Sequence, residues 1–245
     1  MTMLHRIFFA IAFVLISTIT NASVYGVFYG KVYDGLRSTE NDVTALTKVY
    51  RNNRAANGDT LKGGIFLIRG DGVTKHNVIK YFTKQAVDSD YDDILVFAYS
   101  GHGNRNGIFC GEEFITFKEI VSIFNISKAR TKIMYIGSCF SGGAFNAINC
   151  YNLSDKENFI VFTSSGIDEY SYEEVNANYS YFFRYLILGL KGYADKDNNG
   201  TINARELFTF IYDGVDKDTD FLGNKKEHPM MFGRFNENTV LIQWR

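Results

Sequence analysis

Asp93-Ile-Leu-Val-Phe-Ala-Tyr-Ser-Gly-His-Gly103 is a nearly continuous apolar strand that leads directly into a glycine-flanked histidine. A strand that is apolar on both faces is typical of a parallel sheet covered by helices on both sides. The pattern returns at Thr131-Lys-Ile-Met-Tyr-Ile-Gly-Ser-Cys-Phe-Ser-Gly-Gly143, where a second such strand ends in a glycine-rich turn around a cysteine. Because functional groups gather beyond the carboxyl ends of strands in open α/β sheets, the two turns predict a site at one sheet edge.

Strand and helix patterns alternate on both sides of these two stretches. Apolar residues at helical spacing predict helices at 40–54, 74–86, 179–190 and 204–212, with shorter ones ending near 124 and beginning near 142. Main strands are predicted at 24–30, 64–69, 93–100, 131–136, 159–163 and 239–244, and a small hairpin at 109–117. We therefore expect one α/β domain with a mostly parallel, six-stranded sheet between helices. The polar stretch 213–227 is expected to be a flexible loop.

The composition is that of a globular protein and excludes some classes of partner. Hydrophobic residues make up 46% of the 245 residues and charged residues 22%, with a single proline. The formal net charge of −1 provides no basic footprint for nucleic acid or for an anionic membrane surface. We expect no nucleic-acid partner and no organic cofactor, and the charge indicates no particular protein partner or oligomeric state.

The first 22 residues have the pattern of a secretory signal peptide. Arg6 precedes an apolar run at 7–19, and the small residues Ala22 and Ser23 follow it. The run is shorter than the roughly 20 apolar residues that a membrane-spanning helix needs. We expect cleavage after Ala22, leaving an exported, periplasmic or secreted domain at 23–245 with no stable membrane span.

Three cysteines in an exported protein leave at least one thiol unpaired. Cys110 and Cys150 are candidates for a disulfide in an oxidising compartment, but both are equally compatible with buried free thiols. Cys139 is then the unpaired thiol of interest.

Cys139 and His102 are the residue types that nucleophilic catalysis requires. A thiol in a strand-to-helix turn is expected to have a lowered pKa, because the amides and the dipole of the following helix favour the thiolate. His102, at the end of a neighbouring strand, is placed to exchange a proton with it. The backbone amides of Cys139 and Gly103 are candidates for an oxyanion hole. Singly, either side chain would be interpreted as structural, but two such turns together favour catalysis.

The chain resembles the caspase-like cysteine peptidases, a group that includes caspases, metacaspases and legumain. The resemblance rests on Phe97-Ala-Tyr-Ser-Gly-His-Gly103, on Gly137-Ser-Cys-Phe-Ser-Gly-Gly143 and on Thr39-Glu-Asn-Asp-Val-Thr-Ala-Leu46. It implies a caspase-like αβα sandwich in which His102 and Cys139 form a catalytic dyad. It also implies hydrolysis of peptide bonds in a protein or peptide substrate through a thioester acyl-enzyme.

The resemblance leaves the specificity of such an enzyme open. Gly137 stands two residues before the cysteine, where metacaspases usually have Asp and caspases usually have Gln. Asp42 matches an acidic residue that lines the metacaspase pocket, which implies a preference for basic residues. A solvated carboxylate on a helix face is the alternative interpretation of Asp42.

Residues 195–206 match the twelve-position calcium loop of EF-hands. Oxygen donors stand at alternating positions, glycine at the sharp turn and glutamate at the last position. The expected ligands of a single Ca²⁺ are Asp195, Asp197, Asn199, Thr201 and Glu206. A polar interhelical loop without metal is the alternative, and one loop alone does not indicate a regulatory switch.

Two further functions remain compatible with the sequence. The chain could be a catalytically silent, calcium-binding interaction protein on a caspase-like scaffold, since a fold does not establish activity. A transamidase is the other alternative, because an amine as well as water can resolve an acyl-enzyme.

Overall fold

A computed structural model describes residues 23–244 except 34, 53–63, 150–157 and 175–177. The predicted leader at 1–22 and Cys150, one partner of the candidate disulfide, lie outside the described residues. Cys110 is a buried free thiol. None of the helices in the described part combines the length and the apolarity that crossing a bilayer requires.

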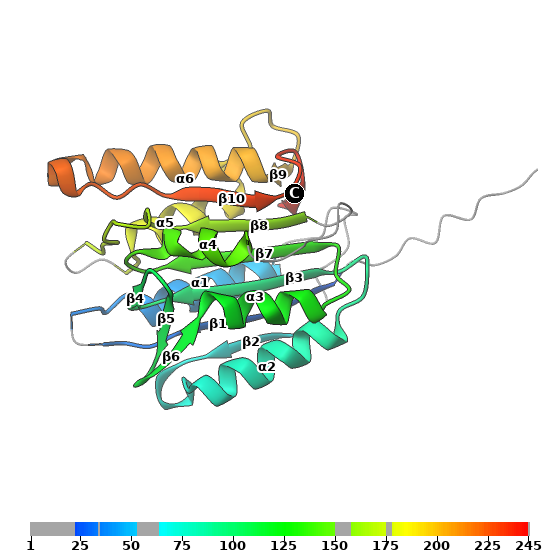
Figure 1. Cartoon of the computed structure of the whole chain (residues 1–245). Coiled ribbons are helices and arrows are strands. Elements are labelled where there is room, and N and C mark those ends of the chain that lie inside the picture. The colour runs from blue at the N-terminus through cyan, green and yellow to red at the C-terminus, as the bar shows by residue number, and fades with distance from the viewer. Residues whose placement is uncertain (1–22, 34, 53–63, 150–157, 175–177, 245) are drawn as a thin grey trace, which may run out of the picture.

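A six-stranded sheet forms the middle of the molecule, as predicted (Figure 1). Its order is β10-β8-β7-β3-β1-β2, and only the pairing of β10 with β8 is antiparallel. The strands are β1 (Val24–Gly30), β2 (Ile65–Ile68), β3 (Ile94–Ser100), β7 (Thr131–Gly137), β8 (Asn158–Thr163) and β10 (Met230–Arg234). β3 and β7 pair from Ile94 with Thr131 to Ser100 with Gly137, so the two apolar strands end side by side.

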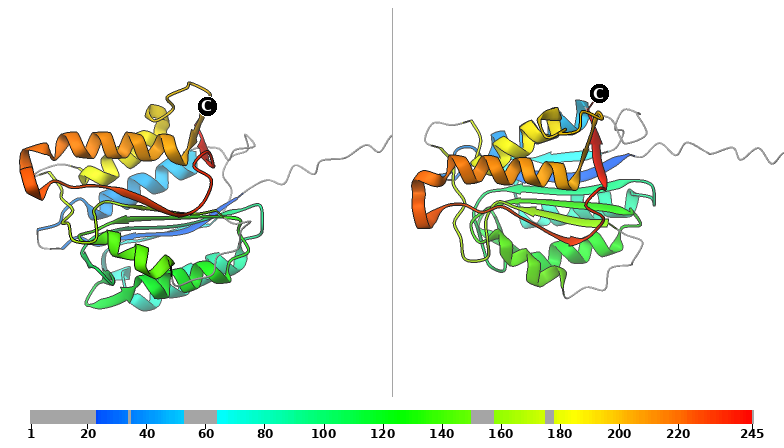
Figure 2. Two further views of the ribbon diagram at one scale, coloured as in Figure 1. Left: turned by 45° about the horizontal axis from the view of Figure 1, so that its top comes forward. Right: turned by 90° about the horizontal axis from the view of Figure 1, so that it is seen from above.

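Helices cover both faces of the sheet, which confirms the αβα sandwich (Figure 2). One layer contains α1 (Thr39–Asn52), α5 (Tyr181–Leu188) and α6 (Ala204–Asp218), and the other contains α2 (Lys75–Asp88), α3 (Phe117–Ile126) and α4 (Ala144–Ile148). Strand side chains alternate between the layers, so Val96 belongs to the first core and Phe97 to the second. This two-sided burial is why the strands are continuously apolar.

A small antiparallel sheet begins directly after His102. It consists of β4 (Gly103–Asn104), β5 (Gly107–Cys110) and β6 (Glu113–Thr116), and it contains the hairpin predicted at 109–117. Thr116 then starts α3 through a capping box with Glu119.

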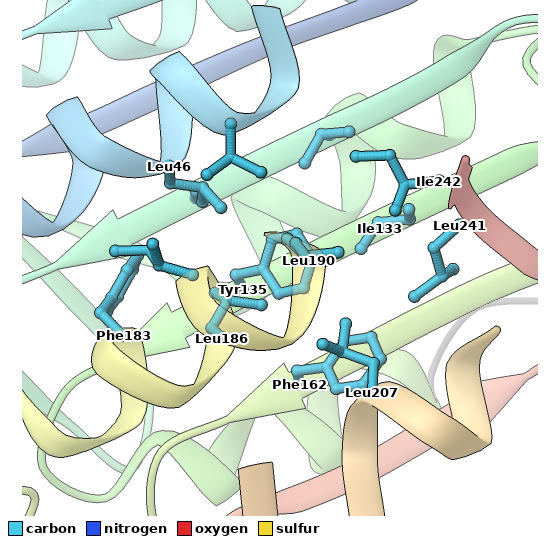
Figure 3. Close-up of a cluster of buried hydrophobic side chains, with 14 of the residues drawn as sticks. Leu46, Ile133, Tyr135, Phe162, Phe183, Leu186, Leu190, Leu207, Leu241 and Ile242 are labelled. Atoms are coloured by element: carbon cyan, nitrogen blue, oxygen red, sulfur yellow. The ribbon is translucent and has the colours of Figure 1, made fainter. Parts of the chain in front are cut away.

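The strand predicted at 239–244 exists, but its predicted place in the main sheet is wrong. β11 (Val240–Gln243) pairs instead with β9 (Thr201–Asn203) in a separate two-stranded sheet. Its Leu241 and Ile242 close one end of the core formed with α1, α5 and α6 (Figure 3). The sixth main strand is β10, an edge strand whose residues are half-buried or exposed and which therefore lacks a strong apolar pattern.

The prediction of a flexible loop at 213–227 is also wrong. α6 continues to Asp218, and the 3-10 turn η4 (Asp220–Lys225) follows it. Leu207, Ile211 and Val215 repeat every fourth residue and are all buried, so the helix is anchored along its length although its outer face is polar. The segment ends at Glu227, which is fully buried.

Candidate active site

The turns after β3 and β7 meet at one cleft of about 70 Å³. His102 follows β3 and Cys139 follows β7, and both side chains line this cleft. The parallel register of the two strands brings together residues 37 positions apart in the chain. The structure therefore brings the two predicted catalytic side chains into one site.

Close backbone contacts shape the turn that carries Cys139. Phe140 adopts a left-handed conformation with a φ of 59°, and its amide donates to the Glu169 carbonyl at 2.7 Å. A Cβ at position 143 would lie 2.0 Å from the Arg105 carbonyl oxygen, so only glycine fits there. The glycine at position 143 thus follows from backbone packing against the segment after His102.

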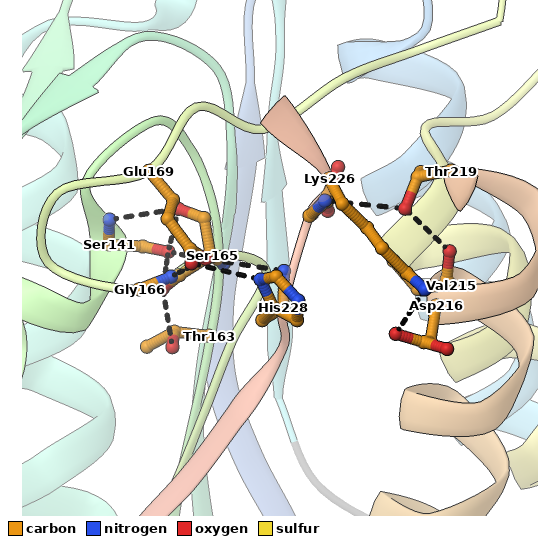
Figure 4. Close-up of polar contacts among 11 residues, drawn as sticks. Ser141, Thr163, Ser165, Gly166, Glu169, Val215, Asp216, Thr219, Lys226 and His228 are labelled. Carbon is orange, nitrogen blue, oxygen red and sulfur yellow. Dashed lines mark hydrogen bonds and ion pairs between the residues drawn. The ribbon is translucent and has the colours of Figure 1, made fainter. Parts of the chain in front are cut away.

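Buried hydroxyls from the end of β8 hold the backbone around Cys139. Ser164 Oγ accepts from the Ser138 amide at 3.1 Å. The Ser138 carbonyl accepts from Ser164 Oγ at 3.2 Å and from Ser165 Oγ at 3.1 Å. Ser141 Oγ accepts from the Ser165 amide at 3.2 Å (Figure 4). This network was not predicted from the sequence, although the three consecutive hydroxyl residues at 163–165, at the end of an apolar strand, are a signal for it.

The thiol of Cys139 is half-buried and donates to the Ser171 carbonyl, with 3.8 Å between sulfur and oxygen. Burial raises its pKa above the ordinary value, the hydrogen bond with Ser171 opposes this, and the nearby Glu227 carboxylate adds to the increase. The prediction of a lowered pKa is therefore wrong for this resting structure. The following helix begins as the short 3-10 turn η2 (Ser141–Gly143) before α4, which has five residues, so its dipole is small.

His102 is exposed at its side chain and fixed at its backbone. Tyr99 Oη donates to the His102 carbonyl at 2.6 Å, and the Phe109 amide donates to the same oxygen at 3.0 Å. The imidazole lies beside the ring of Tyr33, with 5.0 Å between the centroids. The exposed side chain of His102 is part of the cleft lining.

The two residues predicted to supply oxyanion-hole amides lie in adjoining turns. Cys139 lines the cleft, and Gly103 lies against the neighbouring Ser138. A Cβ at position 103 would be 2.5 Å from Ser138 Oγ, so a larger residue would push the turns apart. The oxyanion role of both amides stays a prediction.

Asp42 is fully buried, which excludes the solvated helix-face interpretation. Its carboxylate accepts hydrogen bonds from Ser100 Oγ at 2.7 Å, from Ser180 Oγ at 2.9 Å and, more weakly, from Ser38 Oγ at 3.4 Å. These three serines line the cleft. Burial raises the pKa of Asp42 to about 7, although the serine hydrogen bonds oppose the increase. Asp42 therefore lies behind the cleft wall, and its carboxylate is connected to the cleft by the hydroxyl groups of these serines.

Glu173 is an acidic residue of the cleft that the sequence analysis missed. Its carboxylate accepts from the backbone amides of Arg37 and Ser38 at 2.8 and 2.9 Å. Its negative charge also contributes to the raised pKa of Asp42. Glu173 lies in an irregular segment after β8, where neither periodicity nor a motif marks it.

The predicted calcium ligands lie between η3 (Gly189–Tyr193) and the first turn of α6, which contains Glu206. One carboxylate oxygen from each of Asp195, Asp197 and Glu206 lies within 4.8 Å of the others. Asn199 Oδ1 accepts from the amide and the hydroxyl of Thr201 at 2.8 and 2.6 Å. The donor set is oxygen-only, as Ca²⁺ prefers.

The C-terminal strand closes this loop. β11 pairs with β9 inside the loop, and Trp244 Nε1 donates to Asp195 Oδ2 at 3.0 Å. Asn203 caps α6 through a capping box with Glu206. The loop is thus held at both ends by the rest of the domain.

Comparisons with known proteins agree with this fold. The family model described as the caspase domain matches residues 20–239. No curated protein sequence matches the chain. Among solved structures, caspase-1 from Spodoptera frugiperda is similar with a TM-score of 0.61 and 16% identity, over 88% of this chain and 90% of that one. A protein from Geobacter sulfurreducens is similar with a TM-score of 0.57 and 13% identity, over 86% and 92%. At these identities the solved structures show a shared fold.

Proposed function

The chain belongs to the caspase domain family, and from this premise we propose that it is a cysteine endopeptidase with Cys139 as nucleophile and His102 as general base. The observation that supports the proposal most is the presence of both side chains in one cleft at the ends of adjacent strands. Nucleophilic acyl transfer uses a nucleophile and a general base that lie in one site, and the ends of two paired strands place Cys139 and His102 in this way.

The proposed reaction needs no group beyond the chain and water. His102 takes the thiol proton of Cys139 while sulfur attacks the scissile carbonyl carbon, and the carbonyl oxygen becomes an oxyanion near the Cys139 and Gly103 amides. The protonated His102 then gives its proton to the leaving amine, and a thioester remains on Cys139. Water, deprotonated by His102, attacks the thioester and releases the carboxylic acid and the thiol.

The resting hydrogen bond of Cys139 implies a rearrangement on substrate binding. The thiol donates to the Ser171 carbonyl and has a raised pKa, so it is protonated in the free protein at neutral pH. For attack, the thiol must turn from Ser171 toward His102. Such hydrogen bonds are often formed only in the substrate complex.

We further propose that the cleft prefers Arg or Lys before the scissile bond. Glu173 lines the cleft with a half-buried carboxylate, and Asp42 lies behind the serines of its wall. Since the pKa of Asp42 is about 7, a guanidinium or ammonium group in the cleft would favour its ionised form at neutral pH. The described residues that line the cleft include His102 but neither Lys nor Arg, so the two carboxylates are complementary to a cationic side chain.

Turnover of fluorogenic peptides with Arg, Lys, Asn or Asp before the scissile bond tests both proposals. We expect cleavage after Arg or Lys, a loss of at least about a thousandfold in Cys139→Ala and His102→Ala, and a loss of basic preference in Glu173→Gln. Product analysis with an added amine separates hydrolysis from transamidation. If no peptide is cut and a thiol-reactive probe does not prefer Cys139, the non-catalytic interaction protein is the better account.

We also propose that the loop at 195–206 binds one Ca²⁺ through Asp195, Asp197, Asn199, Thr201 and Glu206. We propose in addition that the domain is exported after removal of residues 1–22. The chain's single tryptophan, Trp244, contacts Asp195 and can sensitise terbium used as a calcium probe. We expect bound terbium to luminesce and added Ca²⁺ to displace it, so that the luminescence decreases. The luminescence should be lost in Asp195→Asn and kept in the control variant Asp220→Asn. Luminescence that survives in Asp195→Asn would contradict the site.

A further inference from the structure

Glu227 is a fully buried acid that the mechanism above does not use. Its carboxylate accepts from the Tyr172 amide at 2.8 Å and from Ser171 Oγ at 3.2 Å. Ser171 and Tyr172 both line the cleft, and the Ser171 carbonyl accepts the thiol of Cys139. Glu227 therefore supports, from behind, the wall against which the nucleophile rests.

The segment that carries Glu227 is held from two sides (Figure 4). The Glu227 amide donates to Thr219 Oγ1 at the end of α6, at 3.3 Å. On one side Lys226 forms ion pairs with Asp216 and Asp220, and on the other His228 Nδ1 lies 2.9 Å from Glu169. These contacts leave Glu227 little freedom to move away from Ser171, so its carboxylate is a fixed feature of the cleft wall.

We propose that Glu227 is a positioning residue of the catalytic cleft, which holds Ser171 and Tyr172 in place beside Cys139 and, when charged, opposes ionisation of the thiol. The inference rests on the proposed cysteine peptidase function. It assigns a role to the C-terminal segment after α6, which carries neither of the two proposed catalytic side chains.

The charge of Glu227 follows from its surroundings. Burial raises its pKa to about 8, the hydrogen bonds from Tyr172 and Ser171 oppose this, and the charge of Glu169 adds to it. The titratable groups that face it are Cys139, Glu169, Tyr172 and Tyr181, while Lys226 and His228 are engaged by Asp216, Asp220 and Glu169.

Because this pKa is raised, Glu227 is mostly uncharged at neutral pH and becomes charged as the pH rises through about 8. In the uncharged form it supports the cleft wall without repelling a thiolate. In the charged form it makes the thiolate less favourable, so the pH at which Cys139 ionises moves upward.

The test compares the full chain with Glu227→Gln, Glu227→Ala and, as a control for the loss of one acidic side chain, Asp213→Asn, which lies at an exposed position of α6. Alkylation of Cys139 by iodoacetamide is measured from pH 6 to 10 by mass spectrometry of the peptide that carries it. kcat and KM are measured with the fluorogenic peptide that is cut best. Circular dichroism and melting temperature check that each variant is folded.

We expect Glu227→Gln to keep kcat at pH 7, because its amide oxygen still accepts from Tyr172. Its alkylation rate at pH 8–9 should increase by up to about threefold, which is the largest change that a shift of about half a unit in the thiol pKa produces. Glu227→Ala should increase alkylation similarly but lower kcat by about ten- to a hundredfold with little change in KM, as a displaced catalytic group does. Asp213→Asn should match the unmodified chain in both measurements.

Identical alkylation profiles for the unmodified chain and Glu227→Gln would overturn the inference, as would an unchanged kcat in folded Glu227→Ala. If Glu227→Ala does not fold, the alkylation profile of Glu227→Gln still decides. Alkylation needs no substrate, so it tests Glu227 independently of turnover. If the alkylation profile of Glu227→Gln is shifted but no peptide is cut, the peptidase function is refuted and the effect of the Glu227 charge on the Cys139 thiol is kept. Turnover with an unshifted profile would refute only the role of Glu227.

Discussion

The two loops that carry the motifs differ in where their hydrogen-bond partners come from. In the acidic loop, Asp195 accepts from amides four and five residues ahead, and Trp244 is its distant partner. At the nucleophile turn, Ser138 is held by Ser164 and Ser165, which are 26 and 27 residues away. The first loop is therefore specified mainly by its own twelve residues, whereas the second depends on the packing of the whole sheet.

The largest expected contrast comes from adding one methyl group to a glycine in each loop. Gly143→Ala places a Cβ 2.0 Å from the Arg105 carbonyl, so we expect turnover to fall by about a hundredfold and the free energy of unfolding by about 1–3 kcal/mol. Gly200→Ala places a side chain on a left-handed backbone with a φ of 83°, which costs about 1–2 kcal/mol. Peptide turnover and urea unfolding measure both. Equal turnover in Gly143→Ala and the unmodified chain would remove the contrast.

The pH dependence of stability should have opposite signs in the two regions. Burial raises the folded-state pKa of Asp42 from 3.8 to about 7 and that of Glu227 from 4.5 to about 8. The folded state therefore binds more protons than the unfolded state between about pH 4 and 8, and these groups make stability fall as the pH rises, by up to about 1.4 kcal/mol per pH unit for one group.

Asp195 should change the pH dependence of stability in the opposite direction. Its pKa is lowered by hydrogen bonds from the Gly200 amide and Trp244, although burial opposes this, so its contribution is present above pH 3.8 and lost in acid. Urea unfolding at several pH values should show a shallower fall between pH 4 and 7 in Asp42→Asn, and a weaker acid loss in Asp195→Asn. Parallel pH profiles for the unmodified chain and both variants would contradict this assignment.

The smallest expected contrast comes from removing one hydroxyl in each loop. Ser165→Ala deletes the bond to the Ser138 carbonyl in a buried site, so we expect a loss of about 1–2 kcal/mol in the free energy of unfolding. Thr201→Ala deletes an exposed hydrogen bond to Asn199, which should cost about 0.5 kcal/mol or less. Urea unfolding without added calcium measures both losses. Equal losses in the two variants would mean that the difference in burial does not change how much a hydroxyl group contributes to stability in the two loops.

The fold was predictable where burial leaves a periodic signal. β3 and β7 are buried on both faces and therefore appear as continuous apolar runs, and α2 follows its N-cap Thr74 at the start of the helix predicted at 74–86. β10 was missed because an edge strand needs no apolar run. The second half of α6 was missed because its exposed face is polar, and β11 was placed in the wrong sheet because a strand pattern does not name its partner.

Only residue types and turn chemistry could be predicted for the candidate site. His102 and Cys139 were identified because glycine-rich turns after apolar strands are visible in one dimension, and the structure brings both into one cleft. The pKa of Cys139 was predicted in the wrong direction because burial and the charge of Glu227 depend on distant segments. Glu173 carried no local signal at all.

The sequence alone therefore determined the alternation of buried strands and helices, the two turns with a histidine and a cysteine, and the acidic loop. Each of these is specified by residues close together in the chain. The tertiary structure decided the order of the strands, the burial of Asp42 and Glu227, and the serine and glutamate partners around Cys139. Burial and charge at a site are sums over segments from the whole chain, and no local pattern contains them.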